Sequence, residues 1–174
     1  MEKIYILEKS VQNQEPLNTF RYYKTRDSKR EPVKAFRDYS EARVECDRLN
    51  YEMTALMNRF IWIDDTRAIS KEIDFISNCI YTQEFPEECS GPPEPHSNNS
   101  MSKTGIDEDH QHLFIANLKK DPESYIAKAQ AVCPGKKTNF WNKVKTYLEF
   151  TNIAGNAYAE LPVYYVNETP IELI

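Results

Sequence analysis

Hydrophobic positions near both ends of the chain follow the pattern of β-strands. Residues 3–11 contain an Ile-Tyr-Ile-Leu run, and residues 161–168 contain a Val-Tyr-Tyr-Val run. Aromatic and β-branched residues of this kind are enriched in strands. Residues 3–11 are apolar on both faces, which indicates a strand in the interior of a sheet or one covered on both sides. We expect the two ends of the chain to belong to one sheet.

Two more strands are predicted after the first one. Residues 20–24 and 33–36 are apolar and aromatic, and the charged segment 25–32 lies between them. Together with residues 3–11 they indicate a hairpin or a three-stranded meander. Basic residues are frequent from Lys24 to Lys34. We interpret that run as a solvated hairpin loop, with a phosphate-contacting patch as the alternative.

A long helix is predicted to start near Asp38 or Ser40. Asp38 precedes Glu41 by three residues, as in a capping box. The apolar positions then recur at steps of four and three: Ala42, Cys46, Leu49, Met53, Leu56 and Phe60. The same spacing resembles a coiled-coil seam, but fewer than three heptads are present. We therefore favour a helix packed on its own sheet.

Further helices are predicted in the middle of the chain. Asp65 or Thr66 would cap a helix whose stripe is Ile69, Ile73, Ile76 and Ile80. A short helix is expected near residues 113–118. Asp121 followed by Pro122 predicts another helix start, and Thr138 a third, with Gly155 as a left-handed exit. Residues 82–105 are rich in Pro, Ser and Asn and predict a long loop.

The order of elements predicts an α+β fold. Its small, mainly antiparallel sheet would be made of the N-terminal strands and the C-terminal strand and packed by helices. We expect a single domain over residues 1–174, with a helical and loop-rich insertion over residues 60–160.

Charge and composition narrow the class of partner. The formal net charge is −5, whereas nucleic-acid binding depends on neutralising phosphates, so we expect no direct nucleic-acid partner. No apolar run has the length of a membrane span and no signal peptide is evident. The four cysteines match no zinc or redox spacing. These features favour a cytoplasmic protein without a cofactor, as a monomer or a homodimer.

Few residues suit catalysis or metal binding. Asp64, Asp65 and Glu72 are close in sequence and provide an alternative as a small metal-dependent hydrolase or nuclease. His110 and His112 are two residues apart, which does not place them on one helical face. Helix capping explains Asp64 and Asp65 more simply. We therefore expect no catalytic and no metal-ligating residues.

Candidate partner-binding residues lie in two places. The first is the aromatic and basic segment beside the predicted hairpin, and the second is the long loop, which would present a surface to a protein partner. These residues are Tyr22, Tyr23, Arg26, Lys29, Arg30, Glu87, Glu88 and His96.

Two segments resemble a known class of protein. The first is residues 33–50, which end in Leu49-Asn50, and the second is the pairing of an Ile4-Tyr5-Ile6 strand with a terminal strand over residues 164–170. Both resemble small uncharacterised accessory proteins of phages and their bacterial hosts. Those proteins have a hairpin, a helix ending in Leu-Asn and a final Tyr-Val-x-Glu strand, and they supply no catalytic motif. This chain departs from them by about a hundred additional residues between the helix and the last strand.

The resemblance implies an accessory protein that acts on host machinery. We expect a non-enzymatic protein-binding module, such as a phage-encoded inhibitor of a bacterial defence system of the anti-CRISPR kind. Besides the hydrolase, a second alternative is a dimer that sequesters a small molecule in a pocket lined by Tyr, Arg and Lys.

Overall fold

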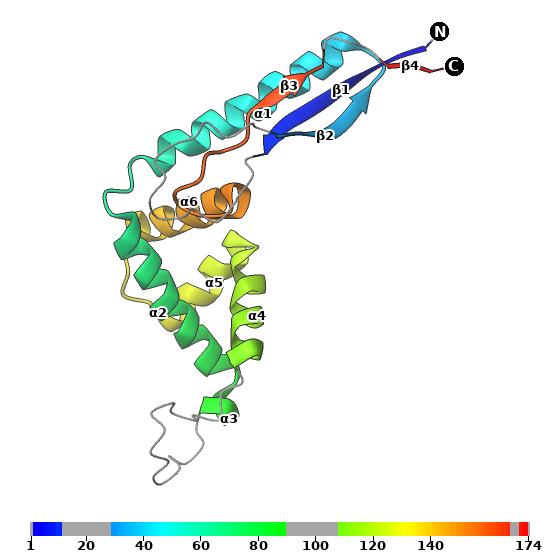
Figure 1. Cartoon of the computed structure of the whole chain (residues 1–174). Helices are drawn as coiled ribbons and strands as arrows, with labels where there is room; N and C mark the ends of the chain where they lie inside the picture. The colour runs from blue at the N-terminus through cyan, green and yellow to red at the C-terminus, as the bar shows by residue number, and fades with distance from the viewer. Residues whose placement is uncertain (1, 12–28, 90–107, 168–170, 174) are drawn as a thin grey trace, which may run out of the picture. The chain divides into compact units, whose positions relative to one another are not determined.

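The computed structural model describes residues 2–11, 29–89, 108–167 and 171–173. Its elements follow the chain as β1 (Glu2–Val11), β2 (Lys29–Phe36), α1 (Tyr39–Phe60), α2 (Thr66–Glu84), α3 (Pro86–Cys89), α4 (Glu108–Lys119), α5 (Pro122–Val132), α6 (Thr138–Ala154), β3 (Tyr164–Val166) and β4 (Ile171–Leu173) (Figure 1). The antiparallel sheet with its helices is an α+β fold, so the predicted fold class is confirmed.

The chain divides into two compact units. Unit 1 consists of Met1–Ile61 and Ile153–Ile174, and unit 2 of Trp62–Asn152. Unit 2 therefore lies in sequence between the two parts of unit 1. That the whole chain forms one domain with an insertion over residues 60–160 stays a prediction.

The sheet of unit 1 has β1 at its centre. β1 pairs antiparallel with β2, with Tyr5 opposite Phe36, and with β3, with Leu7 opposite Val166. β4 also pairs antiparallel with β1. The two ends of the chain thus belong to one sheet, as predicted, and β1 has the interior position that its apolar residues indicate.

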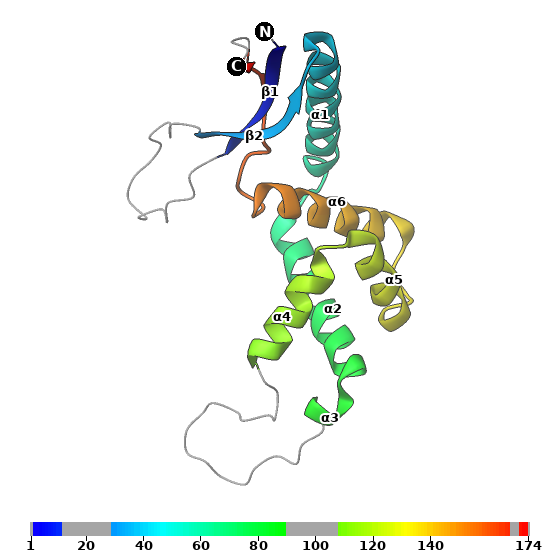
Figure 2. The same ribbon diagram turned by 90° about the vertical axis from the view of Figure 1, so that its right-hand side faces the viewer.

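One face of this sheet packs against α1. The core there consists of Leu7, Ala42, Cys46 and Val166. Because side chains alternate along a strand, Leu7 and Val166 share a face, and the helical spacing of Ala42 and Cys46 presents both to that face. Figure 2 shows α1 alongside β1 and β2. Burying each large apolar side chain stabilises the fold by about 1.5–3 kcal/mol.

Unit 2 is helical, with its core along α2. The predicted stripe of Ile69, Ile73, Ile76 and Ile80 is buried. α2 contacts α3, α4 and α5. Buried polar groups are satisfied there, since the Tyr125 hydroxyl donates to the Ile73 carbonyl at 2.9 Å and lies 2.9 Å from Ser77 Oγ.

The predicted helix starts are confirmed at three places. Asp38, Asp65 and Asp121 each accept a hydrogen bond from the backbone N–H three residues later, at 3.0, 2.9 and 3.2 Å. Each bond satisfies a donor that the first turn leaves without a partner, which is worth about 1 kcal/mol. Gly155 follows α6 with φ 91°, the left-handed exit that the sequence predicts.

Several element boundaries differ from the predictions. β2 begins at Lys29 rather than at residue 33, because the charged residues 29–32 pair with residues 8–11 of β1. α2 continues to Glu84 and α3 follows it, so the first part of the predicted 82–105 loop is helical. α4 starts at Glu108, five residues earlier than predicted.

The closing strand is shorter than the predicted 161–168. Only residues 164–166 form β3. At Val163 a side-chain acceptor takes the place of a backbone acceptor in the ladder. The Val163 N–H donates to Ser10 Oγ at 2.9 Å. The predicted strand 20–24 and most of the predicted loop lie outside the described residues. No helix in the part of the chain that the structure describes has the length and apolar character to cross a membrane.

Candidate functional site

The predicted partner-binding residues are divided between the two units. Tyr22, Tyr23, Arg26 and His96 lie outside the described residues. Lys29 and Arg30 are in β2 of unit 1, whereas Glu87 and Glu88 are in α3 of unit 2. Of these, Arg30 lines a pocket.

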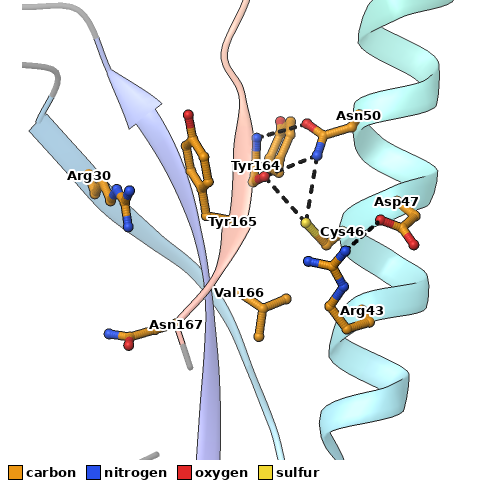
Figure 3. A pocket seen from close by; sticks show the side chains of 9 residues that line it. All are labelled: Arg30, Arg43, Cys46, Asp47, Asn50, Tyr164, Tyr165, Val166 and Asn167. Atoms are coloured by element: carbon orange, nitrogen blue, oxygen red, sulfur yellow. Dashed lines mark hydrogen bonds and ion pairs between the residues drawn. The ribbon is translucent and has the colours of Figure 1, made fainter. Parts of the chain in front are cut away.

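That pocket lies where β3 meets α1, and we call it the edge pocket (Figure 3). Its volume is about 390 Å³. α1 contributes Arg43, Cys46, Asp47 and Asn50. The strands contribute Arg30 and the segment 164–167. All of these residues belong to unit 1.

Asn50 fixes the helix side of the edge pocket to the strand. Its side-chain oxygen accepts from the Tyr164 N–H at 2.8 Å, and its Nδ2 donates to the Tyr164 carbonyl at 3.0 Å. The amide therefore satisfies both outward-facing backbone groups of one strand residue, as a neighbouring strand would. A paired edge does not recruit another chain, so Asn50 protects the sheet at this position.

Cys46 has a structural role beside Asn50. Its thiol donates to the Tyr164 carbonyl at 3.3 Å and is buried in the core. Burial raises the pKa of the Cys46 thiol, with nearby Arg43 acting in the opposite direction. A raised pKa keeps the sulfur protonated near neutral pH, which makes it a poor nucleophile.

Val166 presents its backbone N–H and C=O at the open edge of the sheet. The directions follow from its neighbours, since the Asn167 N–H donates to Ile6 and the Ser10 N–H donates to Val163, both at 2.9 Å. In an antiparallel pair these directions alternate from residue to residue. Among the described residues, no hydrogen bond is made to the Val166 backbone at this edge. One strand position is thus left open in the pocket.

On the face of the sheet opposite α1, which we call the outer face, Arg30 lies over Tyr165. The guanidinium carbon is 4.3 Å from the centre of the tyrosine ring, and Arg30 Nη1 is 3.9 Å from Glu8. Tyr165 is opposite Glu8 in the sheet register, so both share the outer face. A cation over an aromatic face is attracted by about 0.5–1 kcal/mol at an exposed site.

Arg43 and Arg48 differ in how many of their N–H groups donate hydrogen bonds within the protein. Arg48 bonds Glu45 at 2.7 and 2.8 Å and Glu52 at 2.5 Å, and these partners raise its pKa. Within the described ranges, the acidic partner of Arg43 is Asp47, at 3.6 Å, which exceeds hydrogen-bond distance. Arg43 therefore retains donor capacity in the edge pocket.

A second polar cluster lies in unit 2 around α3. The Tyr81 hydroxyl donates to Glu88 and lies 3.1 Å from His110 Nδ1. Phe85 packs edge-on against Phe114 and His110 and at a tilt against Tyr81, and Phe114 packs edge-on against Tyr81. Glu88 thus joins α3 to α2 and α4, whereas Glu87 is exposed.

The residues considered for a metal-dependent hydrolase do not converge. Asp65 caps α2, Asp64 is exposed, and Glu72 lies 3.6 Å from Lys136. His112 is exposed on α4. Among residues 2–11, 29–89, 108–167 and 171–173, no group of three or more His, Cys, Asp or Glu side chains is placed to hold a metal ion. The geometry gives the hydrolase alternative no support.

Comparisons with protein-family models, with curated proteins and with solved structures found no match. The resemblance of residues 33–50 and of the terminal strand to phage accessory proteins therefore stays a prediction.

Of the residues that line the edge pocket, the sequence predicted a binding role for Arg30 and missed the others, among them Arg43, Asn50 and Tyr165. Asn50 lies within the predicted long helix and Tyr165 within the predicted closing strand, but nothing in the sequence distinguished their roles. Arg43 is at a polar position of an amphipathic helix and has no local signal. A cue existed for Tyr165, since it alternates with Tyr164 in a strand that must face two environments.

Proposed function

We propose that this chain is a non-enzymatic protein-binding module. The observation that carries the proposal is the Arg30–Tyr165 stack on the outer face of the sheet. Tyr165 remains 37% exposed and the Arg30 side chain 53% exposed. Tyr and Arg are, with Trp, the residue types enriched among the residues that dominate binding energy at protein interfaces.

Apolar residues on the same face support this function. Ile4 and Ile6 alternate with the buried Leu7, and Ile171 lies opposite Ile4. Within unit 1, α1 is the helix that contacts the sheet, and it does so on the other face. Exposed apolar residues bordered by charges are typical of interaction surfaces.

More specifically, we propose that the protein is a phage-encoded inhibitor of a bacterial defence system and acts in the bacterial cytoplasm. The resemblance of the hairpin, the Leu49-Asn50 helix and the terminal strand supports this assignment. The uneven charge is compatible with it: unit 1 contains 12 basic and 13 acidic residues, whereas unit 2 contains 10 and 14. An acidic unit 2 complements a basic surface on a nucleic-acid-handling target.

The test is affinity capture from a lysate of a bacterium that carries such a system, followed by mass spectrometry. We expect a stoichiometric partner with the wild-type protein and its loss with Tyr165→Ala. Tyr158→Ala is the matched control, because Tyr158 is a more exposed tyrosine of the same unit. Expression of the protein should also restore phage plating on that host. Absence of any stoichiometric partner would refute the proposal.

The edge pocket also favours the ligand-sequestering alternative, because Arg30, Arg43, Tyr164 and Tyr165 supply two of the three residue types expected for it. That alternative requires a dimer enclosing the pocket. Sedimentation equilibrium decides between the two, since a monomer at micromolar concentration contradicts the ligand-sequestering dimer and leaves the protein-binding module intact.

A further inference from the structure

The edge pocket is locally positive in an acidic protein. The chain carries a net charge of −5. Of the described residues that line the pocket, Arg30 and Arg43 are cations and Asp47 is an anion. The lining therefore has one more positive than negative charge, and Glu8, outside the lining but 3.9 Å from Arg30, balances the charge on the outer face and leaves the arginine donors as the distinguishing feature.

Both arginines keep hydrogen-bond donors for another molecule. Their distances to Glu8 and Asp47, 3.9 and 3.6 Å, are those of ion pairs without a hydrogen bond. The Tyr165 ring holds the Arg30 guanidinium in place, with its carbon 4.3 Å from the ring centre. A guanidinium edge matches the two oxygens of a carboxylate.

Besides the charged side chains, the edge pocket offers backbone hydrogen-bonding groups of fixed direction. The Val166 N–H and C=O face the open sheet edge, and Asn50 blocks the adjacent position at Tyr164. An extended peptide that continues a sheet needs such a backbone position. Because one position is open along the described part of β3 and the pocket measures about 390 Å³, the site suits a few residues rather than a long added strand.

We propose that the edge pocket binds a short acidic peptide segment of the protein partner. One carboxylate of the segment would bond Arg43 on the α1 side of the edge, the carboxylate of the next residue would bond Arg30 on the outer face, and the backbone would bond Val166. This inference rests on the proposed protein-binding function and specifies the chemistry of the segment that is recognised.

The experiment is an NMR titration of the ¹⁵N-labelled full chain with three probes. The first is the peptide acetyl-Ala-Glu-Glu-Ala-amide, the second its Gln-Gln counterpart, and the third inorganic phosphate. The Val166 amide and the arginine Nε–H groups report binding. Arg43→Gln is the test variant, and Arg48→Gln is the matched control, because Arg48 has the same charge on the same helix but is engaged by Glu45 and Glu52.

We expect the Glu peptide to shift the Val166 amide and the Gln peptide to bind at least about tenfold more weakly, as the loss of a charge-assisted hydrogen bond predicts. Arg43→Gln should weaken binding of the Glu peptide by a similar factor, whereas Arg48→Gln should leave that binding unchanged. Equal binding of both peptides, an unchanged Arg43→Gln variant, or tighter binding of phosphate at the same resonances would overturn the proposal.

Failure of this inference is distinguishable from failure of the proposed function. If an Arg30→Gln/Arg43→Gln double variant still captures the cellular partner, the acidic-peptide site is wrong and the protein-binding module stands. If the Glu peptide binds as expected but no partner is captured, the protein-binding function is wrong and the pocket keeps its chemistry.

Discussion

Asn50 of α1 makes hydrogen bonds with both backbone polar groups of Tyr164 in β3, 114 residues later in the chain. The side chain does for the edge strand what a further strand would do. It also ties the N-terminal part of unit 1 to its C-terminal part.

Replacing Asn50 should destabilise unit 1 in a pH-dependent way. Asn50→Ala removes both bonds and leaves two backbone groups poorly satisfied, so we expect a loss of about 1–3 kcal/mol in the free energy of unfolding. In Asn50→Asp, the ionised carboxylate accepts from the Tyr164 N–H but cannot donate to its carbonyl. Urea unfolding at several pH values measures both.

The protonation of the introduced carboxyl in Asn50→Asp sets the sign of the pH dependence. A protonated carboxyl regains the donor, so folding favours the protonated form and raises the pKa of the introduced acid above about 3.9. The gap in stability between Asn50→Asp and wild type should narrow as the pH falls through that range. Asn58→Ala, an exposed position of α1, is the control. A loss at Asn58 equal to that at Asn50 would contradict the role of the amide.

Tyr125 should make unit 2 sensitive to alkali. Its side chain is fully buried, and burial raises the pKa of Tyr125 to about 12. The unfolded chain loses this proton near pH 10. Stability is therefore fully present below pH 10 and is lost as the pH rises toward 12, with a slope of at most about 1.4 kcal/mol per pH unit.

The measurement is thermal unfolding of wild type and Tyr125→Phe between pH 8 and 11. Tyr125→Phe removes the bond to the Ile73 carbonyl and should cost about 1 kcal/mol at neutral pH. Tyr125→Phe should also lack the decrease in stability at alkaline pH that the Tyr125 hydroxyl causes. Tyr158→Phe, at an exposed tyrosine, should keep it. An identical alkaline slope in all three proteins would show that Tyr125 is not the group responsible.

The helices and their starts could be predicted because their determinants are local. An Asp three residues before a free N–H and an apolar stripe at helical spacing are present in the sequence itself, and Asp38, Asp65 and Asp121 act as caps for that reason. The α2 stripe of isoleucines is buried in the same way. Tertiary contacts were not needed to identify these elements.

The site could not be predicted, because it depends on strand register. A register shift between Leu7 and Glu8 places Arg30 opposite Ser10 and so on the outer face with Tyr165. Without the shift, Arg30 would pair with Val11 and point to the α1 side. A shift of one residue reverses the face of every side chain beyond it, and composition alone does not reveal it. The Asn50–Tyr164 contact likewise joins residues that no local pattern connects.

Cys46 should react more slowly with iodoacetamide than Cys133. It is 1% exposed, its pKa is raised by burial, and its thiol is bonded to Tyr164, whereas Cys133 is half-buried. Site-resolved mass spectrometry of the native protein measures the two rates, and they should become equal in urea. Asn50→Ala should accelerate modification of Cys46 without affecting Cys133. Faster native labelling of Cys46 would contradict its burial.

Leu7 and Ile6 are neighbours on opposite faces of β1. Substitutions at these two positions should therefore affect stability and partner binding differently. Leu7 is fully buried against α1, so Leu7→Ala should lower the free energy of unfolding by about 2–5 kcal/mol. Ile6 is half-buried on the outer face, so Ile6→Ala should cost less stability.

Partner capture is the second measurement on this pair. If the outer face is the interaction surface, Ile6→Ala weakens capture of the partner while the protein remains folded by circular dichroism. A Leu7→Val variant, which keeps most of the buried volume, should retain both the fold and capture. Undiminished capture by Ile6→Ala would move the interaction surface off this part of the sheet, and a larger stability loss at Ile6 than at Leu7 would mean that the outer face is buried in the folded protein.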